Sequence, residues 1–233
     1  ANRLGHVQIV DVPVKPRGHV QVSVEAKTTI SRAAKWGRIS SPGSLSIERH
    51  SGNLGLWVCN NYANRMSYHR LHDDGGAITV TNNSVKLDGT LEIPDGVAIS
   101  CDNRFMAISN HETHQVFTYA LAGPGQARRI GQLNSVNYPH GLRFTPGGDA
   151  VVVADAGLPF VHVFKTDSNW SGDHVPTHHV RVMDDATYLR GRVNPMEGGT
   201  KGIDIDPVRG IIATTSEFQP LQFFNLADVL CST

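Results

Sequence analysis

The sequence predicts an all-β fold, a β-propeller of four-stranded blades, with five blades if the ring is complete or as part of a six-bladed ring. The main support for this prediction is a segment that occurs three times. In each copy a Gly opens an alternating apolar strand, and a second apolar strand ends in a small polar residue. The first two copies lie about 45 residues apart, a spacing typical of stacked or radial units. Helical signal is weak, because short period-2 apolar runs separated by Gly, Pro, Asn and Asp dominate the chain.

The repeats place equivalent residues at equivalent positions. Their first strands open at Gly96, Gly141 and Gly202, and their second strands end at Asn110, Asp155 and Ser216. A looser copy precedes them, with Asn60 as its polar stop. We therefore expect one propeller domain over residues 1–233, with repeats near 42–92, 93–137, 138–198 and 199–233.

The remaining elements are predicted from the segments that lie outside the three repeated strands. Residues 1–41 would supply the closing strand of the last blade, from HVQIVDV at 6–12, or an extra partial blade. Outer strands are expected near 84–87, 127–133 and 178–183, and short helices at 29–37 and 183–190. The fourth copy ends without an outer strand, so the predicted state is a monomer or a homo-oligomer formed by strand exchange.

The longest insert, residues 166–199, separates the third and fourth copies. Loops longer than about 12–15 residues are usually functional or disordered. Because this insert contains Trp170 and Tyr188, we expect an ordered lid or flap over one face of the propeller.

Composition limits the class of partner and the compartment. The formal net charge is +0, which argues against nucleic acid and anionic membranes and favours a small-molecule or glycan ligand. No run approaches the ~20 apolar residues of a membrane span, and no signal peptide is visible. The three cysteines, Cys59, Cys101 and Cys231, are an odd set without metal-type spacing. They favour a reducing, cytoplasmic location without establishing one.

Propeller geometry converts the repeats into a candidate site. The residue before each Gly and the polar residue ending each second strand should gather at one mouth of the central channel. The predicted catalytic residues are Asp95, His140 and Lys201. The predicted substrate-binding residues are Asn60, His111, His114, Glu197, Ser216 and Glu217. The predicted metal ligands are Asp95, Asn110, His140 and Asp155.

Two interpretations of these polar residues remain open. Carboxylate and amide oxygens suit one divalent cation such as calcium, and histidines would shift the preference toward zinc, with calcium the first expectation. An Asn or Asp after a strand also commonly bonds its own turn backbone and needs no ligand. Lys201 would repel a cation and suits a substrate carboxylate or phosphate instead. The glycines are expected to permit close approach of the inner strands.

The segments PDGVAIS and PHGLRFTPGGDAVVVADAG resemble blades of the NHL-repeat, gluconolactonase and lactonase-like propeller superfamily, over about residues 42–228. In gluconolactonase-type enzymes a divalent cation sits in the channel, and the resemblance places Asp95, His140 and Lys201 at the matching positions. The PHG segment at His140 is similar to the zinc-ligand context of amidating-lyase propellers.

Two functions from different classes are compatible with these observations. The first is a metal-dependent hydrolase of a small lactone or ester, with its site at the channel mouth. The alternative is a non-catalytic propeller that recognises a glycan, peptide or protein partner through the same face. A tightly bound divalent ion would distinguish the first from the second.

Overall fold

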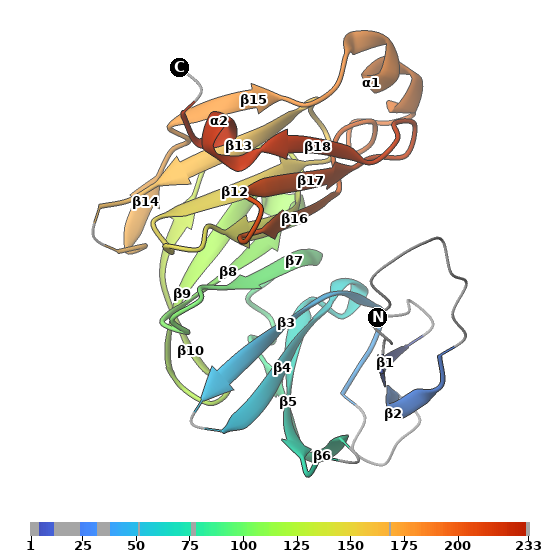
Figure 1. Cartoon of the computed structure of the whole chain (residues 1–233), viewed down its shortest axis with the longest axis vertical. Coiled ribbons are helices and arrows are strands. Elements are labelled where there is room, and N and C mark those ends of the chain that lie inside the picture. The colour runs from blue at the N-terminus through green and yellow to red at the C-terminus, as the bar shows by residue number, and fades with distance from the viewer. Residues whose placement is uncertain are drawn as a thin grey trace.

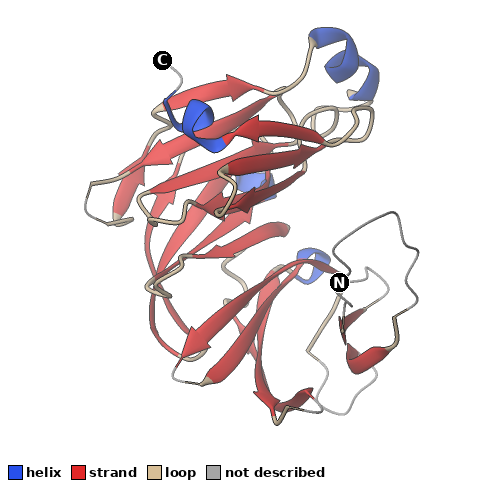
Figure 2. Cartoon of the chain, viewed as in Figure 1, coloured by secondary structure: helices blue, strands red, loops and turns tan. Residues whose placement is uncertain are grey.

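A computed structural model describes residues 5–11, 24–31, 38–50, 52–75, 78–167 and 169–231. The chain is all-β and forms a β-propeller, as the repeats predict (Figures 1 and 2). The described residues form four main sheets, one from each repeat, where five blades or part of a six-bladed ring were expected. The inner strands of successive sheets pack against one another in the order β3, β7, β11, β16. No described helix is long and apolar enough to cross a membrane.

Each sheet is built on an antiparallel meander that begins at the channel and runs outward, and the second sheet gains a fifth, parallel strand at its outer edge. The first contains β3 (Pro42–His50), β4 (Asn53–Asn60), β5 (Arg65–Asp73) and β6 (Ile78–Lys86). The second contains β7 (Pro94–Ile99), β8 (Phe105–Asn110), β9 (Gln115–Gly123) and β10 (Gln126–Leu133). The third contains β11 (Pro139–Phe144), β12 (Ala150–Asp155), β13 (Phe160–Lys165) and β15 (His178–Arg181). The fourth contains β16 (Gly202–Asp206), β17 (Ile211–Thr215) and β18 (Gln222–Asn225).

Short helical segments follow several strands. Turns η1 (Asn61–Ala63) and η2 (His111–Thr113) come directly after the second strands of the first two sheets. Helix α2 (Leu226–Cys231) follows β18, where the other sheets have their outer strand. The sequence predicts the absence of that strand but not the helix.

The hydrophobic core lies between neighbouring sheets. The first and second sheets share Trp57, Met66, Val97 and Ile108, and the third and fourth share Val152, Val161, Ile203 and Ile212. Another cluster joins the second and third sheets. This arrangement fixes the sheets radially and leaves the inner edges of the inner strands to line the channel.

Among its described residues, the N-terminal segment does not close the last sheet. Strand β1 (His6–Val10) pairs with β2 (Ala26–Ser31) in a separate antiparallel hairpin. Val7 and Ile30 bury their side chains against Leu56 of the first sheet, so the hairpin packs beside that sheet. The predicted helix at 29–37 is a strand as far as Ser31, and residues 32–37 lie outside the described residues.

The 166–199 insert is structured and connects two sheets. Its strand β14 (Gly172–His174) adds in parallel to β10, and β15 then returns to pair with β13. Trp170 is 0% exposed, and its Nε1 donates to Gly148 O at 3.0 Å. Helix α1 (Asp185–Gly191) begins after Asp184, which accepts a capping bond from Thr187 N. The helix expected at 183–190 is present as α1, and the role of the insert as a lid or flap remains a prediction.

Candidate functional site at the polar channel mouth

One end of the channel is a polar cavity of about 190 Å³, which we call the polar mouth. It is built from the residues that open the inner strands, from η1 and η2, and from the end of the 166–199 insert. Its lining residues are Asn61, Tyr62, Ile93, Asp95, His111, Glu112, His140, Met196, Glu197 and Lys201. Five of the residues predicted from sequence therefore meet here, namely Asp95, His111, His140, Glu197 and Lys201.

Local backbone irregularity brings Asp95 and His140 to the mouth. The register of β7 against β8 shifts between Pro94 and Val97, and that of β11 against β12 shifts between Pro139 and Leu142. Such bulges turn a side chain away from the regular alternation of a strand and are common beside active sites. Asp95 and His140 each lie inside one of these shifts, just before the repeat Gly.

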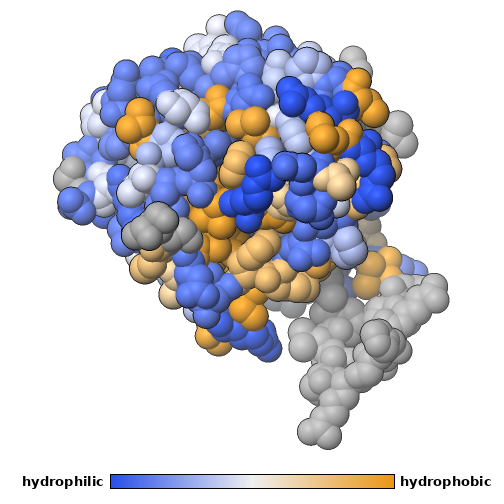
Figure 3. Space-filling view, turned by 90° about the horizontal axis from the view of Figure 1, so that it is seen from above, coloured by the Kyte–Doolittle hydropathy of each residue, from blue (hydrophilic) through white to orange (hydrophobic). Residues whose placement is uncertain are grey.

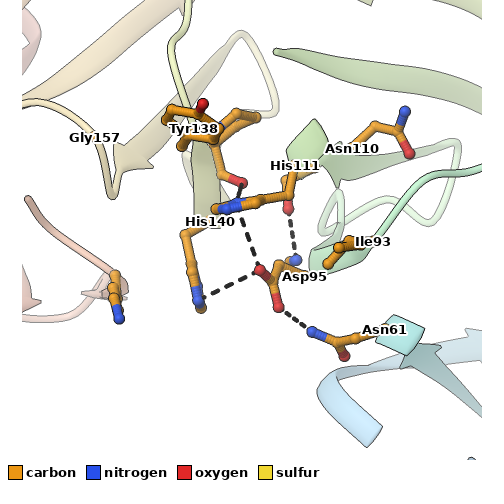
Figure 4. A network of polar contacts seen from close by, with 12 residues as sticks. Asn61, Ile93, Asp95, Asn110, His111, Tyr138, His140 and Gly157 are labelled. Atoms are coloured by element: carbon orange, nitrogen blue, oxygen red, sulfur yellow. Dashed lines mark hydrogen bonds and ion pairs between the residues drawn. The ribbon is translucent and has the colours of Figure 1, made fainter. Parts of the chain in front are cut away.

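Asp95 is the centre of the polar mouth. Its carboxylate is only 7% exposed, and its Oδ2 lies 3.5 Å from His111 Nδ1 and 3.5 Å from His140 Nε2. Figure 4 shows the two imidazoles directed at this carboxylate, with Asn61 approaching its other oxygen. The arrangement places two potential proton carriers around one buried acceptor.

The two histidines differ in their surroundings. His111 is held by its neighbours, because its Nδ1 also lies 3.3 Å from Pro139 O and its ring packs 5.1 Å from that of Tyr138. The His140 side chain is 24% exposed, against 9% for His111. His140 is therefore the imidazole of the pair that solvent and ligand reach more easily.

Asn61 completes the inner shell of the mouth. Its Nδ2 donates to Asp95 Oδ1, while its own Oδ1 is buried with no hydrogen-bond partner among the described residues. A Cβ on Gly43 would collide with this amide, so the repeat Gly of the first sheet provides the space for Asn61. An unpaired buried acceptor in a polar cavity is the site for a donor group on a ligand or a water.

Lys201 and Glu197 form an ion pair at the rim. The backbone holds Lys201 from both sides, since Lys201 N donates to Thr215 O at 3.0 Å and Lys201 O accepts from Gly141 N at 2.8 Å. A Cβ on Gly141 would lie 2.6 Å from Lys201 O. The glycine is therefore needed for the close approach of β11 and β16, as the sequence predicts.

The strand-ending residues Asn60, Asn110 and Asp155 do not line the polar mouth. Each uses its side chain to hold the backbone that leads into the inner strand of its own sheet. Asn60 Oδ1 accepts from Ser40 N at 2.6 Å, Asn110 Oδ1 from Glu92 N at 2.6 Å, and Asp155 Oδ2 from Asn137 N at 2.7 Å. The structural alternative describes these three residues better than the metal-ligand alternative does.

Of these three residues, Asp155 accepts the most hydrogen bonds from backbone N–H groups. Its carboxylate is fully buried and also accepts from Tyr138 N at 3.0 Å, Gly157 N at 2.9 Å and His162 Nε2 at 2.8 Å. Burial alone would raise the pKa of Asp155, but the hydrogen bonds from His162, Tyr138 and Asn137 outweigh it and hold the pKa below its usual range. Both oxygens are thus committed to the loop that leads to His140.

The other predicted substrate-binding residues lie outside the cavity. His114 adopts a left-handed backbone conformation (φ 56°) and packs its ring 4.5 Å from that of Tyr138. Glu217 is exposed and Ser216 half-buried, and neither lines the polar mouth.

Asn61, Glu112 and Met196 line the polar mouth but were not among the residues predicted from the sequence. A signal for Asn61 was present, because it follows its polar stop as His111 follows Asn110. Glu112 and Met196 have no counterpart in the repeat pattern.

The donors at the polar mouth do not match a ready-made cation site. Nowhere in the described ranges do three or more His, Cys, Asp or Glu form a group that could hold a metal ion. Around Asp95 the neighbouring donors are mainly imidazole nitrogens, which suit zinc better than the calcium expected from sequence. These residues do not form a preformed cation site, and calcium binding remains a prediction.

Comparisons with known proteins support the fold. No family model and no curated protein matches the chain. Among solved structures, hydrazine synthase of Kuenenia stuttgartiensis is similar at TM-score 0.55 and 16% identity over 80% of this chain. A structure of a nidogen/laminin complex is similar at TM-score 0.59 and 13% identity over 96%. This chain spans 46% of the first of those chains and 72% of the second. At these identities the similarity establishes a propeller-type fold alone.

Proposed function

We propose that this propeller binds a small ester or lactone in its polar mouth and hydrolyses it by general acid–base catalysis. The observation that carries the proposal is the buried Asp95 carboxylate, which lies 3.5 Å from two imidazole nitrogens inside a cavity. The likeness of the repeats to lactonase-type blades supports the choice of substrate class. Fold likeness by itself does not specify an activity.

Three residues have separate roles in this proposal. Asp95 orients His140 and stabilises its imidazolium. His140 takes the proton from an attacking water and returns it to the leaving oxygen. A separation of 3.5 Å is longer than a hydrogen bond, but such contacts commonly tighten when substrate binds.

Lys201 supplies the positive charge that hydrolysis needs. Attack on a carbonyl places negative charge on its oxygen, and a nearby ammonium stabilises that charge in a site with little water. Glu197 holds Lys201 at the rim. No step is assigned to a cation, since the residues at the mouth are not arranged as a metal site.

A panel of small aryl esters and γ- and δ-lactones tests the proposal. The His140→Asn variant should lose about 10²–10⁴-fold in kcat/KM, the usual contribution of a positioned acid–base group. His72→Asn is the matched control, because His72 is exposed on β5 and lies outside the mouth. Each assay is run with EDTA, with added Ca²⁺ and with added Zn²⁺. Absence of turnover across the panel under all three conditions would overturn the proposal.

A second candidate function is binding of a peptide, glycan or protein at the same face. Its specific observation is that Leu189 and Val193 are 63% and 77% exposed on the segment that also supplies Met196 to the mouth. Exposed apolar side chains on a segment that contributes to a cavity wall favour an interaction surface on that segment. The surface seen from above is otherwise mainly hydrophilic, with apolar residues gathered near its middle (Figure 3).

A further inference from the structure

The channel has a second cavity at the end opposite the polar mouth, with different chemistry. It is about 350 Å³ in volume and lies where the inner strands end and turn outward. All four inner strands contribute to its wall, through Leu45, Ile47, Ile99, Phe144 and Ile205 among others. A volume of this size lies within the range of small-molecule sites, about 300–1,000 Å³. We call it the apolar cavity.

Side chains in its wall remain partly accessible. Leu45 and Ile47 on β3, Ile99 on β7 and Ile205 on β16 are each only half-buried. Covering these walls would remove apolar surface from water, which favours a ligand with an apolar body.

Of the described residues that line this cavity, only Arg143 is charged. Its Nε donates to Asp204 Oδ1 at 2.8 Å and its Nη1 donates to Leu142 O at 2.8 Å. Within the part of the chain that the structure describes, no acceptor takes its Nη2. Asp204 is 74% exposed and does not line the cavity. Because exposed ion pairs are weak, this pair leaves the guanidinium able to bind another anion.

From these observations we infer that the apolar cavity is a binding site for a small apolar carboxylate. The apolar body occupies the space between the four inner strands, and the carboxylate accepts hydrogen bonds from Arg143, whose planar fork matches its geometry. This site is separate from the polar mouth, and the inference does not depend on the proposed hydrolysis.

A matched pair of probes tests the role of charge. 2-Naphthoate and 2-naphthamide have the same apolar body, but only the first is an anion at pH 7. By calorimetric titration, naphthoate should bind at least tenfold more tightly than naphthamide. The Arg143→Met variant should remove that preference, while Arg190→Met on the exposed face of α1 should keep it. Equal affinity of the two probes for the unmodified protein would overturn the inference.

Cys101 provides a readout that locates the bound probe without any structural variant. This exposed thiol lies in the cavity wall, whereas the exposed Cys231 on α2 lies outside it. Bound naphthoate should slow modification of Cys101 by N-ethylmaleimide and leave the rate at Cys231 unchanged, with peptide mass spectrometry separating the two sites. Equal slowing at both cysteines, or at neither, would contradict binding in this cavity. The hydrolysis assay reports on the opposite end of the channel, so the two proposals can fail independently.

Discussion

Replacing Asp155 by Ala should destabilise the whole fold, because this carboxylate organises the entry to the third sheet. The substitution removes the acceptor of the partly buried N–H groups of Asn137 and Tyr138 and of the buried N–H of Gly157. The buried His162 imidazole loses its partner as well. Each buried donor left unpaired costs about 1–3 kcal/mol. Part of the deficit will be recovered by water, so we expect a loss of about 3–5 kcal/mol in the free energy of unfolding.

The Asp155→Asn variant separates the effect of lost hydrogen bonds from the effect of lost side-chain volume. Asp155→Asn keeps one oxygen, which can still accept from Tyr138 N and Gly157 N, but it places an amide nitrogen opposite Asn137 N. We expect about half the loss seen with Ala. For a domain of this size, about 1 kcal/mol corresponds to a shift of roughly 2–4 °C in Tm, so the Ala variant should melt about 10 °C below the unmodified protein.

The assay is urea unfolding followed by circular dichroism, with thermal melts alongside. Asp173→Ala is the control, because Asp173 is exposed on β14 and its loss should change stability by less than about 0.5 kcal/mol. Each melt is repeated with EDTA. A loss below about 1 kcal/mol for Asp155→Ala would refute the structural role. A loss that disappears when EDTA is present in both samples would instead favour the metal-ligand role predicted from sequence.

Three further predictions concern stability, protonation and the rim of the mouth. The free energy of unfolding should fall below about pH 4, because the pKa of Asp155 is lowered in the folded state. The contribution of Asp155 is complete above its unfolded-state pKa of about 3.9 and is lost as pH falls through the folded-state pKa. If urea titrations show the same loss of stability at acid pH in an Asp155→Asn variant, this explanation is contradicted. Burial lowers the pKa of His69 to about 4, so the imidazole should stay neutral at pH 5, and NMR evidence of half-protonation near pH 6.5 would count against it. Gly96→Ala should lower the free energy of unfolding by about 1–3 kcal/mol in urea, since the new Cβ would collide with His140 O and force β7 away from β11. Gly123→Ala is the control, because its Cβ would make only an ordinary contact of 3.9 Å. Equal stability of the two variants would refute the packing argument.

The propeller fold was predictable because its signal is repeated. The Gly and strand-ending residues recur with one spacing, so one interpretation had to explain several segments at once. The N-terminal strand was not predictable in the same way. HVQIVDV has the composition of a strand, but periodicity does not identify its partner, and burial of Val7 and Ile30 against Leu56 decides its place beside the first sheet.

The candidate site was predictable in part. The repeats correctly indicated that Asp95, His140 and Lys201 approach one another, because these residues precede the inner-strand glycines. Side-chain direction was harder to infer. Asn110 stands one residue before the mouth-lining His111, and the side-chain oxygens of Asn110 and Asp155 bond nearby backbone N–H groups instead of entering the mouth. The competition between a local hydrogen bond and a ligand is set by loop geometry, which the sequence pattern does not encode.

The most direct test of the central claim is the effect of Asp95→Asn on hydrolysis of the fastest ester or lactone in the panel. This variant keeps the size of the side chain but removes the charge that faces His111 and His140. We predict a loss of at least about 100-fold in kcat/KM with little change in Tm, since the charge supports proton transfer at His140. Unchanged kcat/KM in the Asp95→Asn variant would contradict the assignment of the polar mouth as the functional site.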